Sequence, residues 1–118
     1  MSIAAIILTK NEELHIERCI ASLKGVCDEV FVVDSFSTDR TVEIAKALGA
    51  TVLQNAWKNY ATQFNWALAN CPIKSDWLWR IDADEYLSGG LGEAVKMRID
   101  GADEAVNGFY VRKKIVFM

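Results

Sequence analysis

The feature that constrains this chain most is its alternation of short apolar runs with amphipathic stretches. Residues 2–9, 30–33, 51–53 and 77–81 are dominated by aliphatic and aromatic side chains. Short apolar runs of this kind are typical of strands buried on both faces. A stretch with helical periodicity separates each run from the next. This order predicts an α/β fold, a doubly wound and mostly parallel sheet with helices on both faces.

Three helices are predicted between these strands. We expect Asn11 to cap the first helix, Gly25 to end it, and Gly49 to end the second. The third occupies residues 59–70 and stops before Pro72, which cannot continue a helix. On each helix, residues suited to a buried face recur at helical spacing. They are Ile16, Cys19, Ile20 and Leu23; Thr41, Ile44, Ala45 and Leu48; and Tyr60, Phe64, Ala67 and Cys71.

The last third of the sequence predicts a helix near residues 91–99 and a fifth strand at 109–118. With 118 residues, the chain has the length of one domain, 1–118. The sequence stops in or just after the fifth strand, so we expect a truncated fold. Truncation would leave apolar sheet surface uncovered, and we therefore expect the chain to self-associate.

Composition argues against several classes of protein. A net charge of −3 argues against general nucleic-acid binding. Cys19, Cys27 and Cys71 match neither a disulfide framework nor a zinc pattern, which favours a reducing compartment. The longest aliphatic run, residues 3–8, is too short to span a membrane, and no signal peptide is visible. We expect a cytoplasmic protein, with a peripheral position at the inner face of the membrane as an alternative.

Polar residues follow three of the four strands at the point where each strand ends. They are residues 9–12, Asp34-Ser35, and Asp82-Ala83-Asp84. The carboxyl ends of parallel strands share one edge of a sheet, and ligands bind outside that edge. A carboxylate at Asp34 is well placed to accept hydrogen bonds from a ribose or a base. No glycine-rich phosphate loop follows the first strand, which disfavours dinucleotide-binding and P-loop proteins.

Asp82 and Asp84 are the candidate metal ligands. They lie two residues apart, so in extended geometry their side chains leave the same face of the strand. Crowded carboxylates suit Mg²⁺ or Mn²⁺, ions that commonly bridge to substrate phosphates. The alternative is that Asp82, Asp84 and Glu85 form a solvated turn.

Four sequence blocks together resemble the family 2 glycosyltransferases. They are ILTKNEE at 7–13, VVDSFSTDRT at 32–41, QFNWAL at 63–68 and IDADE at 81–85. The chain is most similar to the branch that contains the lipopolysaccharide-core β-glucosyltransferases. The resemblance implies the GT-A nucleotide-sugar-binding fold, a nucleoside-diphosphate sugar as donor (foremost a UDP-sugar), and Mg²⁺ or Mn²⁺. It also implies inversion at the anomeric carbon and a glycan or lipid-linked acceptor such as lipopolysaccharide core.

The resemblance also implies roles for single residues. Thr9 and Asn11 match positions that line the base pocket, Asp34 one that contacts the nucleoside, and Asp84 the direct metal ligand. Asp82 matches a position beside the ribose and the metal. The full set carried over for the donor is Thr9, Asn11, Glu12, Asp34, Asn65 and Asp82, and for the metal Asp84 and Asp82.

Three departures from the family pattern bear on function. Ser35 stands where many members have a second aspartate, and Phe64 stands where many have arginine. Members of the family have further chain after the fifth strand, which supplies the acceptor site and usually the general base. We therefore expect the catalytic base to lie beyond residue 118. Asp100, Asp103 and Glu104 are the only later acids before that point.

Alternative functions fit parts of the same pattern. A non-catalytic module that binds a nucleotide sugar would need the donor residues but no base. A sugar nucleotidyltransferase has a related sheet, but its glycine-rich basic loop after the first strand is absent. Trp57 or Tyr60 could form an aromatic platform for a sugar, whereas Trp77 and Trp79 are expected in the core.

Overall fold

The computed structural model describes residues 2–84 and 114–116. Its five strands form one sheet in the order β3-β2-β1-β4-β5, and every pair of neighbours is parallel. The strands are β1 (Ile3–Thr9), β2 (Glu29–Asp34), β3 (Thr51–Gln54), β4 (Trp77–Asp82) and β5 (Lys114–Val116). The predicted α/β fold with a parallel sheet is confirmed.

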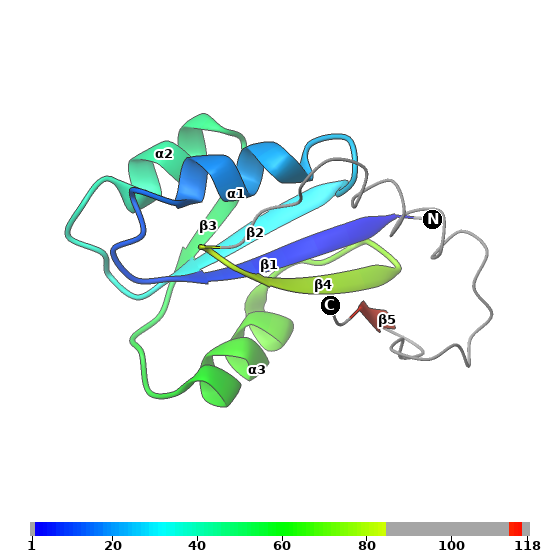
Figure 1. The fold of residues 1–118 in the computed structure, drawn as a ribbon. Helices are drawn as coiled ribbons and strands as arrows, with labels where there is room; N and C mark the ends of the chain where they lie inside the picture. Colours follow the sequence, from blue (N-terminus) through cyan, green and yellow to red (C-terminus); the bar gives the residue numbers. More distant parts are fainter. Residues whose placement is uncertain (1, 85–113, 117–118) are drawn as a thin grey trace.

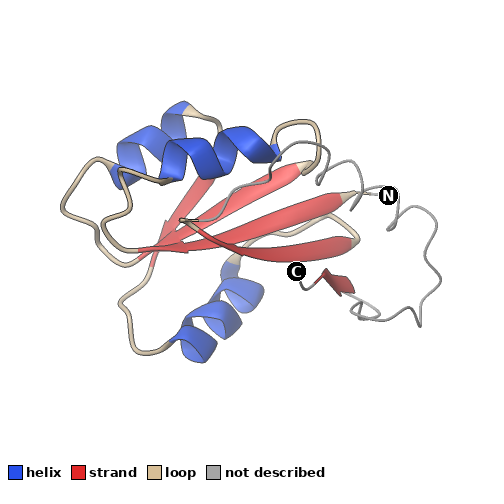
Figure 2. Cartoon of the chain, in the orientation of Figure 1, coloured by secondary structure: helices blue, strands red, loops and turns tan. Residues whose placement is uncertain are grey.

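Helices cover both faces of this sheet (Figures 1 and 2). Helices α1 (Ile16–Leu23) and α2 (Thr41–Ala47) lie together on one face, and α3 (Tyr60–Asn70) lies on the other. Alternate residues of β1 belong to the two apolar cores: Ala5 and Ile7 pack with α1 and α2, whereas Ala4 and Ile6 pack with α3. Because both faces are covered, β1 has an uninterrupted apolar sequence.

The first helix begins later than the sequence predicts. Helix α1 starts at Ile16 with His15 at its N-cap position, so the prediction that Asn11 caps it is wrong. Asn11 has a left-handed backbone (φ 52°), and its Oδ1 accepts a hydrogen bond from the Thr38 N–H at 2.9 Å. The amide that could have capped α1 therefore binds the neighbouring loop. The buried stripe of α1 and the glycine ends of α1 and α2 match the prediction.

The buried face of α3 also differs from the prediction. Ala67 and Cys71 are buried as predicted, whereas Tyr60 and Phe64 are only partly buried, and the buried residue between them is Gln63. The central carbon of the Arg80 guanidinium lies over both rings, 4.8 Å from the centre of the Tyr60 ring and 5.7 Å from the centre of the Phe64 ring. An exposed cation on β4 thus covers the aromatic side of α3, and a glutamine takes the deeper position.

The remaining predictions concern mainly β4 and the last third of the chain. Trp77 and Trp79 are each 1% exposed, which confirms that they are core residues. The helix at 91–99 and the three late acids lie outside the described residues, as does most of the strand at 109–118. Within residues 2–84 and 114–116, no helix is both long and apolar enough to cross a membrane.

Candidate functional site at the carboxyl edge of the sheet

The ends of β2, β1 and β4 lie side by side at one edge of the sheet. Thr9, the last residue of β1, pairs with Asp34 of β2, and Leu8 pairs with Asp82 of β4. The parallel register therefore brings the predicted polar ends together. The same register places the two strand-terminal aspartates on opposite sides of the end of β1.

Asp34 is fully buried and is surrounded by hydrogen-bond donors of this chain. Its Oδ1 accepts hydrogen bonds from the Thr9 hydroxyl at 2.7 Å and the Ser37 hydroxyl at 2.5 Å. Its Oδ2 accepts one from the Ser37 N–H at 2.8 Å. A buried carboxylate needs partners of this kind, because burial without them is costly. Asp34 therefore fastens the end of β1 to the loop after β2.

The loops after β1 and β2 are joined to each other at further points. The Asn11 N–H donates to the Ser37 hydroxyl at 2.8 Å, and the Glu12 N–H donates to Thr41 Oγ1 at 2.8 Å. The Lys10 ammonium donates to the carbonyls of Ser35 and Phe36. The two blocks at 7–13 and 32–41 thus hold each other in place.

Asp39 contributes a charged acceptor to the same junction. It accepts hydrogen bonds from the N–H and hydroxyl of Thr41 and, at 3.2 Å, from the Glu13 N–H. Burial raises the pKa of the Asp39 carboxyl, but these hydrogen bonds outweigh burial and leave its pKa below the ordinary aspartate value. Asp39 therefore stays ionised and ties the first turn of α2 to the loop after β1.

Gln63 fastens α3 to this edge from the opposite face. Its Nε2 donates to the Ser35 hydroxyl at 3.1 Å and to the Asn55 carbonyl at 3.0 Å. Its Oε1 accepts from the Asn55 side-chain amide at 2.8 Å. Because these groups satisfy the amide, Gln63 can be 1% exposed in an otherwise apolar layer.

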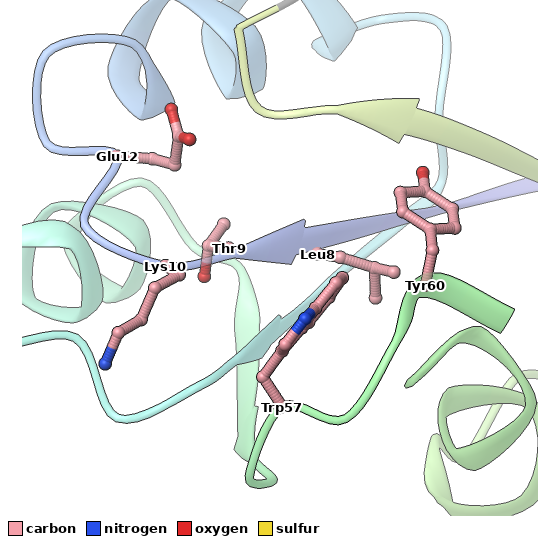
Figure 3. A pocket seen from close by; sticks show the side chains of 6 residues that line it. All are labelled: Leu8, Thr9, Lys10, Glu12, Trp57 and Tyr60. Carbon is pink, nitrogen blue, oxygen red and sulfur yellow. The ribbon is translucent and has the colours of Figure 1, made fainter. Parts of the chain in front are cut away.

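A pocket of about 240 Å³ opens between these loops and the start of α3 (Figure 3). Trp57 is 49% exposed and meets the Tyr60 ring edge to face, with ring centres 6.2 Å apart. In Figure 3 the Trp57 ring lies beside Leu8, and the Tyr60 hydroxyl points towards β4. The lining residues are Leu8, Thr9, Lys10, Glu12, Trp57 and Tyr60. The pocket thus combines an aromatic wall with polar groups, as small-molecule sites commonly do.

The end of β4 has a different character from the end of β2. Asp82 and Asp84 are both exposed, and the Tyr60 hydroxyl donates to Asp82 Oδ1 at 2.6 Å. Within the described part of the chain, no three His, Cys, Asp or Glu side chains form a group that could hold a metal ion. Two exposed carboxylates nevertheless fit Mg²⁺, which often takes one or two protein carboxylates and completes its shell with water and substrate phosphates.

The structure separates the predicted site residues into four groups. Thr9 and Glu12 line the pocket, and Asp82 and Asp84 lie at the end of β4. Asp34 and Asn11 hold the loops around the pocket and do not line it. The last predicted residue, Asn65, is exposed on α3 and is absent from the pocket lining.

Sequence reasoning did not assign Lys10 or Gln63 to the site, and named Tyr60 only as an alternative platform. Tyr60 had a usable signal, because it stands directly after Asn59, whose side chain caps α3 by accepting from the Thr62 N–H. A residue at the amino end of a helix that packs on a parallel sheet lies near the ligand-binding edge. Lys10 lies in the polar stretch 9–12 and Gln63 opens the block at 63–68, but neither stretch singles out that residue.

Comparison with known proteins agrees with this geometry. Residues 4–115 match the family described as Glycosyl transferase family 2. A glycosyltransferase from Rickettsia bellii is 50% identical over 94 residues, which is 80% of this chain and 31% of the relative. The lipopolysaccharide core biosynthesis glycosyltransferase LpsC from Rhizobium meliloti is 33% identical over 111 residues, covering 90% of this chain and 40% of LpsC.

Solved structures show the same fold. Glucosyl-3-phosphoglycerate synthase from Mycobacterium tuberculosis, in complex with Mn²⁺, UDP and glucosyl-3-phosphoglycerate, matches with a TM-score of 0.60 and 29% identity. The match covers 72% of this chain and 35% of the synthase. The chain thus spans about a third of the length of these relatives. With the GT-A fold in place and the family pattern matched over residues 4–115, this chain belongs to glycosyl transferase family 2.

Proposed function

We propose that this chain is the donor-binding part of a glycosyltransferase that uses a nucleoside-diphosphate sugar, foremost a UDP-sugar. The observation that carries the proposal is the pocket at the carboxyl edge of the sheet, with exposed Asp82 beside it. Two comparisons support it: a similar solved structure is a complex with Mn²⁺ and UDP, and LpsC is named for lipopolysaccharide core biosynthesis. A cell-envelope glycan such as lipopolysaccharide core is therefore the proposed acceptor.

Residues in and around the pocket have different proposed roles in binding the donor. The exposed face of Trp57 gives a flat apolar surface on which a base or sugar ring can stack. Glu12 and the end of β1 supply polar groups at the opposite side of the pocket. Asp34 and Asn11 act indirectly by fixing the loops, because their polar atoms bind Thr9, Ser37 and Thr38.

Asp82 and Asp84 are the proposed holders of Mg²⁺ or Mn²⁺. Both side chains are exposed at or just beyond the end of β4, and Asp82 accepts a hydrogen bond from Tyr60, which lines the pocket. When bound, such an ion supplies Lewis-acid stabilisation of the charge that develops on the leaving diphosphate. The chain's own part is to supply two exposed carboxylates, two residues apart, which would take up a cation together with its phosphate ligands.

Inversion at the anomeric carbon belongs to the same proposal. The acceptor hydroxyl must lose its proton to a general base as it attacks. We assign this base, together with the acceptor site, to the part of the relatives' length that this chain does not span. A cytoplasmic location and self-association remain predictions, and sedimentation well above micromolar concentration tests the second.

Calorimetric titration of the chain with UDP and UDP-glucose tests the proposal. We expect binding in the presence of Mn²⁺ and loss of binding when EDTA removes the ion, with GDP as the control for base preference. A folded chain that binds neither ligand in either condition contradicts the donor site. Hydrolysis of UDP-glucose by the chain separates a transferase from a module that only binds the donor.

A further inference from the structure

We propose that Tyr60 is a positioning residue for Asp82, so that the first residue of α3 sets the geometry of the candidate metal site. The proposal rests on the proposed function and adds a residue to it. Its central observation is the hydrogen bond of 2.6 Å from the Tyr60 hydroxyl to Asp82 Oδ1. A hydroxyl donating to an ionised carboxylate forms a short and strong hydrogen bond.

Tyr60 is itself held in place from within α3. Asn59 caps the helix by accepting from the Thr62 N–H at 2.8 Å, which fixes the backbone at Tyr60. Gln63, less than one turn further on, is bonded to Asn55 and Ser35. The start of α3 is therefore bound both to its own cap and to the loops at the carboxyl edge. The hydroxyl of Tyr60 thus projects from a fixed base.

Arg80 fixes the ring of the same tyrosine from β4. Its guanidinium lies 4.8 Å from the centre of the Tyr60 ring and 5.7 Å from that of Phe64. Arg80 and Asp82 are two residues apart on β4, so their side chains leave the same face of the strand. The strand therefore meets Tyr60 twice, through a cation above the ring and through a carboxylate at the hydroxyl. A contact at both ends restricts the ring far more than either contact alone.

This arrangement matters because Asp82 is exposed. An exposed carboxylate samples several rotamers and must be ordered when a cation binds. The hydrogen bond from Tyr60 orders it in advance, and a carboxylate has about four lone-pair sites, so accepting this bond is compatible with binding a cation. Partners that orient metal ligands typically affect metal affinity by about 10- to 100-fold. Tyr60 therefore has a specific role that its packing does not require.

Substituting Tyr60→Phe removes the hydroxyl and keeps the ring beneath Arg80. At fixed UDP, we expect the Mn²⁺ concentration for half-saturation of the chain to rise about tenfold, since an orienting partner is lost. Saturating Mn²⁺ should restore UDP affinity, and the melting temperature should stay that of the parent. Thr62→Ala, which removes an exposed hydroxyl from the same helix, is the matched control and should change neither. Electron paramagnetic resonance of free Mn²⁺, with UDP alone as blank, gives the measurement.

Arg80→Met provides a second route that leaves the hydroxyl intact. Without the cation above the ring, we expect a rise of about threefold in the same Mn²⁺ concentration, in line with a cation–π contact at an exposed site. Unchanged Mn²⁺ dependence in Tyr60→Phe overturns the positioning role and leaves the donor site standing. Failure of the parent chain to bind UDP with Mn²⁺ overturns the proposed function and this inference with it.

Discussion

The strands β2 and β4 both end in an aspartate at the same edge of the sheet, but the two carboxylates have different surroundings. Asp34 is fully buried and accepts hydrogen bonds from Thr9 and from two groups of Ser37. Asp82 is exposed and accepts a hydrogen bond from Tyr60, which lines the pocket. The same residue type at neighbouring strand ends therefore lies in two different environments.

This difference teaches how the edge is built. The loops after β1 and β2 hydrogen-bond to each other, through Asn11, Ser37 and Thr38. The end of β4 leaves Asp82 and Asp84 at the surface. The joined loops thus frame the pocket on one side, while the carboxylates on the other side are exposed to solvent. Variants on the two sides should accordingly separate stability from binding.

The largest expected effect is on stability, in Asp34→Ala. Removing this carboxylate leaves the Thr9 and Ser37 donors without their acceptor in a buried site. We expect the free energy of unfolding to fall by about 3 kcal/mol, since each orphaned buried group costs about 1–3 kcal/mol. Urea denaturation measures the change. Asp84→Ala, at an exposed position, is the control and should stay within about 0.5 kcal/mol of the parent. Equal losses in both would remove the distinction between the two strand ends.

On the other side of the comparison, Asp84→Asn should affect binding and not stability. Replacing the proposed metal ligand by a neutral amide should weaken Mn²⁺-dependent UDP binding by about 100-fold, because hard cations prefer charged oxygen ligands. The urea midpoint should not move. Asp76→Asn changes an exposed aspartate just before the amino end of β4 and serves as the control. Mn²⁺-dependent affinity that survives in Asp84→Asn contradicts the metal assignment.

The fold and the edge of the sheet that carries the candidate site could be predicted from the sequence. Which of its aspartates is buried and which is exposed could not. Apolar runs and helical spacing are local patterns, so they predict strands, helices and the edge where polar residues gather. Whether Asp34 or Asp82 is exposed depends on donors far away in the sequence, such as Thr9 and Tyr60. Both aspartates follow an apolar strand, and nothing local distinguishes them.

The predicted buried face of α3 was partly wrong for the same reason, namely hydrogen-bond partners that are distant in the sequence. Apolar periodicity favours Tyr60 and Phe64 for burial and places polar Gln63 outside. Gln63 is buried because Ser35 and Asn55, from a different loop each, satisfy its amide. The Asn11 cap prediction failed for a related reason, since Thr38 takes the side chain that a cap would use. Tertiary hydrogen bonds overrule local preference at these points.

A smaller effect is expected at Phe36, in the loop that frames the pocket. Phe36 is 58% exposed and has a left-handed backbone (φ 53°), while its N–H donates to Gln54 and its carbonyl accepts from Lys10. Glycine keeps both backbone contacts and adopts this φ freely, so Phe36→Gly should stabilise the chain by about 1 kcal/mol. Phe36→Ala loses the ring but keeps Cβ and should show no such gain. Thermal unfolding compares the three proteins, and destabilisation by glycine would mean that the ring itself supports the frame.

The smallest effect concerns pH, and it compares this edge with the opposite one. Glu29, at the amino end of β2, accepts hydrogen bonds from Ser75 and from the Lys74 N–H. Burial raises the pKa of Glu29, but these hydrogen bonds outweigh burial and leave its pKa below the ordinary glutamate value. The pKa of Asp39 is lowered in the same manner. A carboxyl with a lowered pKa in the folded chain stabilises it above the unfolded pKa, and this contribution is lost as pH falls through the folded pKa. The urea midpoint should therefore drop below about pH 5.

Glu29→Gln should make this drop shallower, because one of the two carboxylates no longer takes up a proton on unfolding. A midpoint that rises on acidification would contradict both assignments, whereas an unchanged slope in Glu29→Gln would leave Asp39, at the frame of the pocket, as the group that sets acid sensitivity.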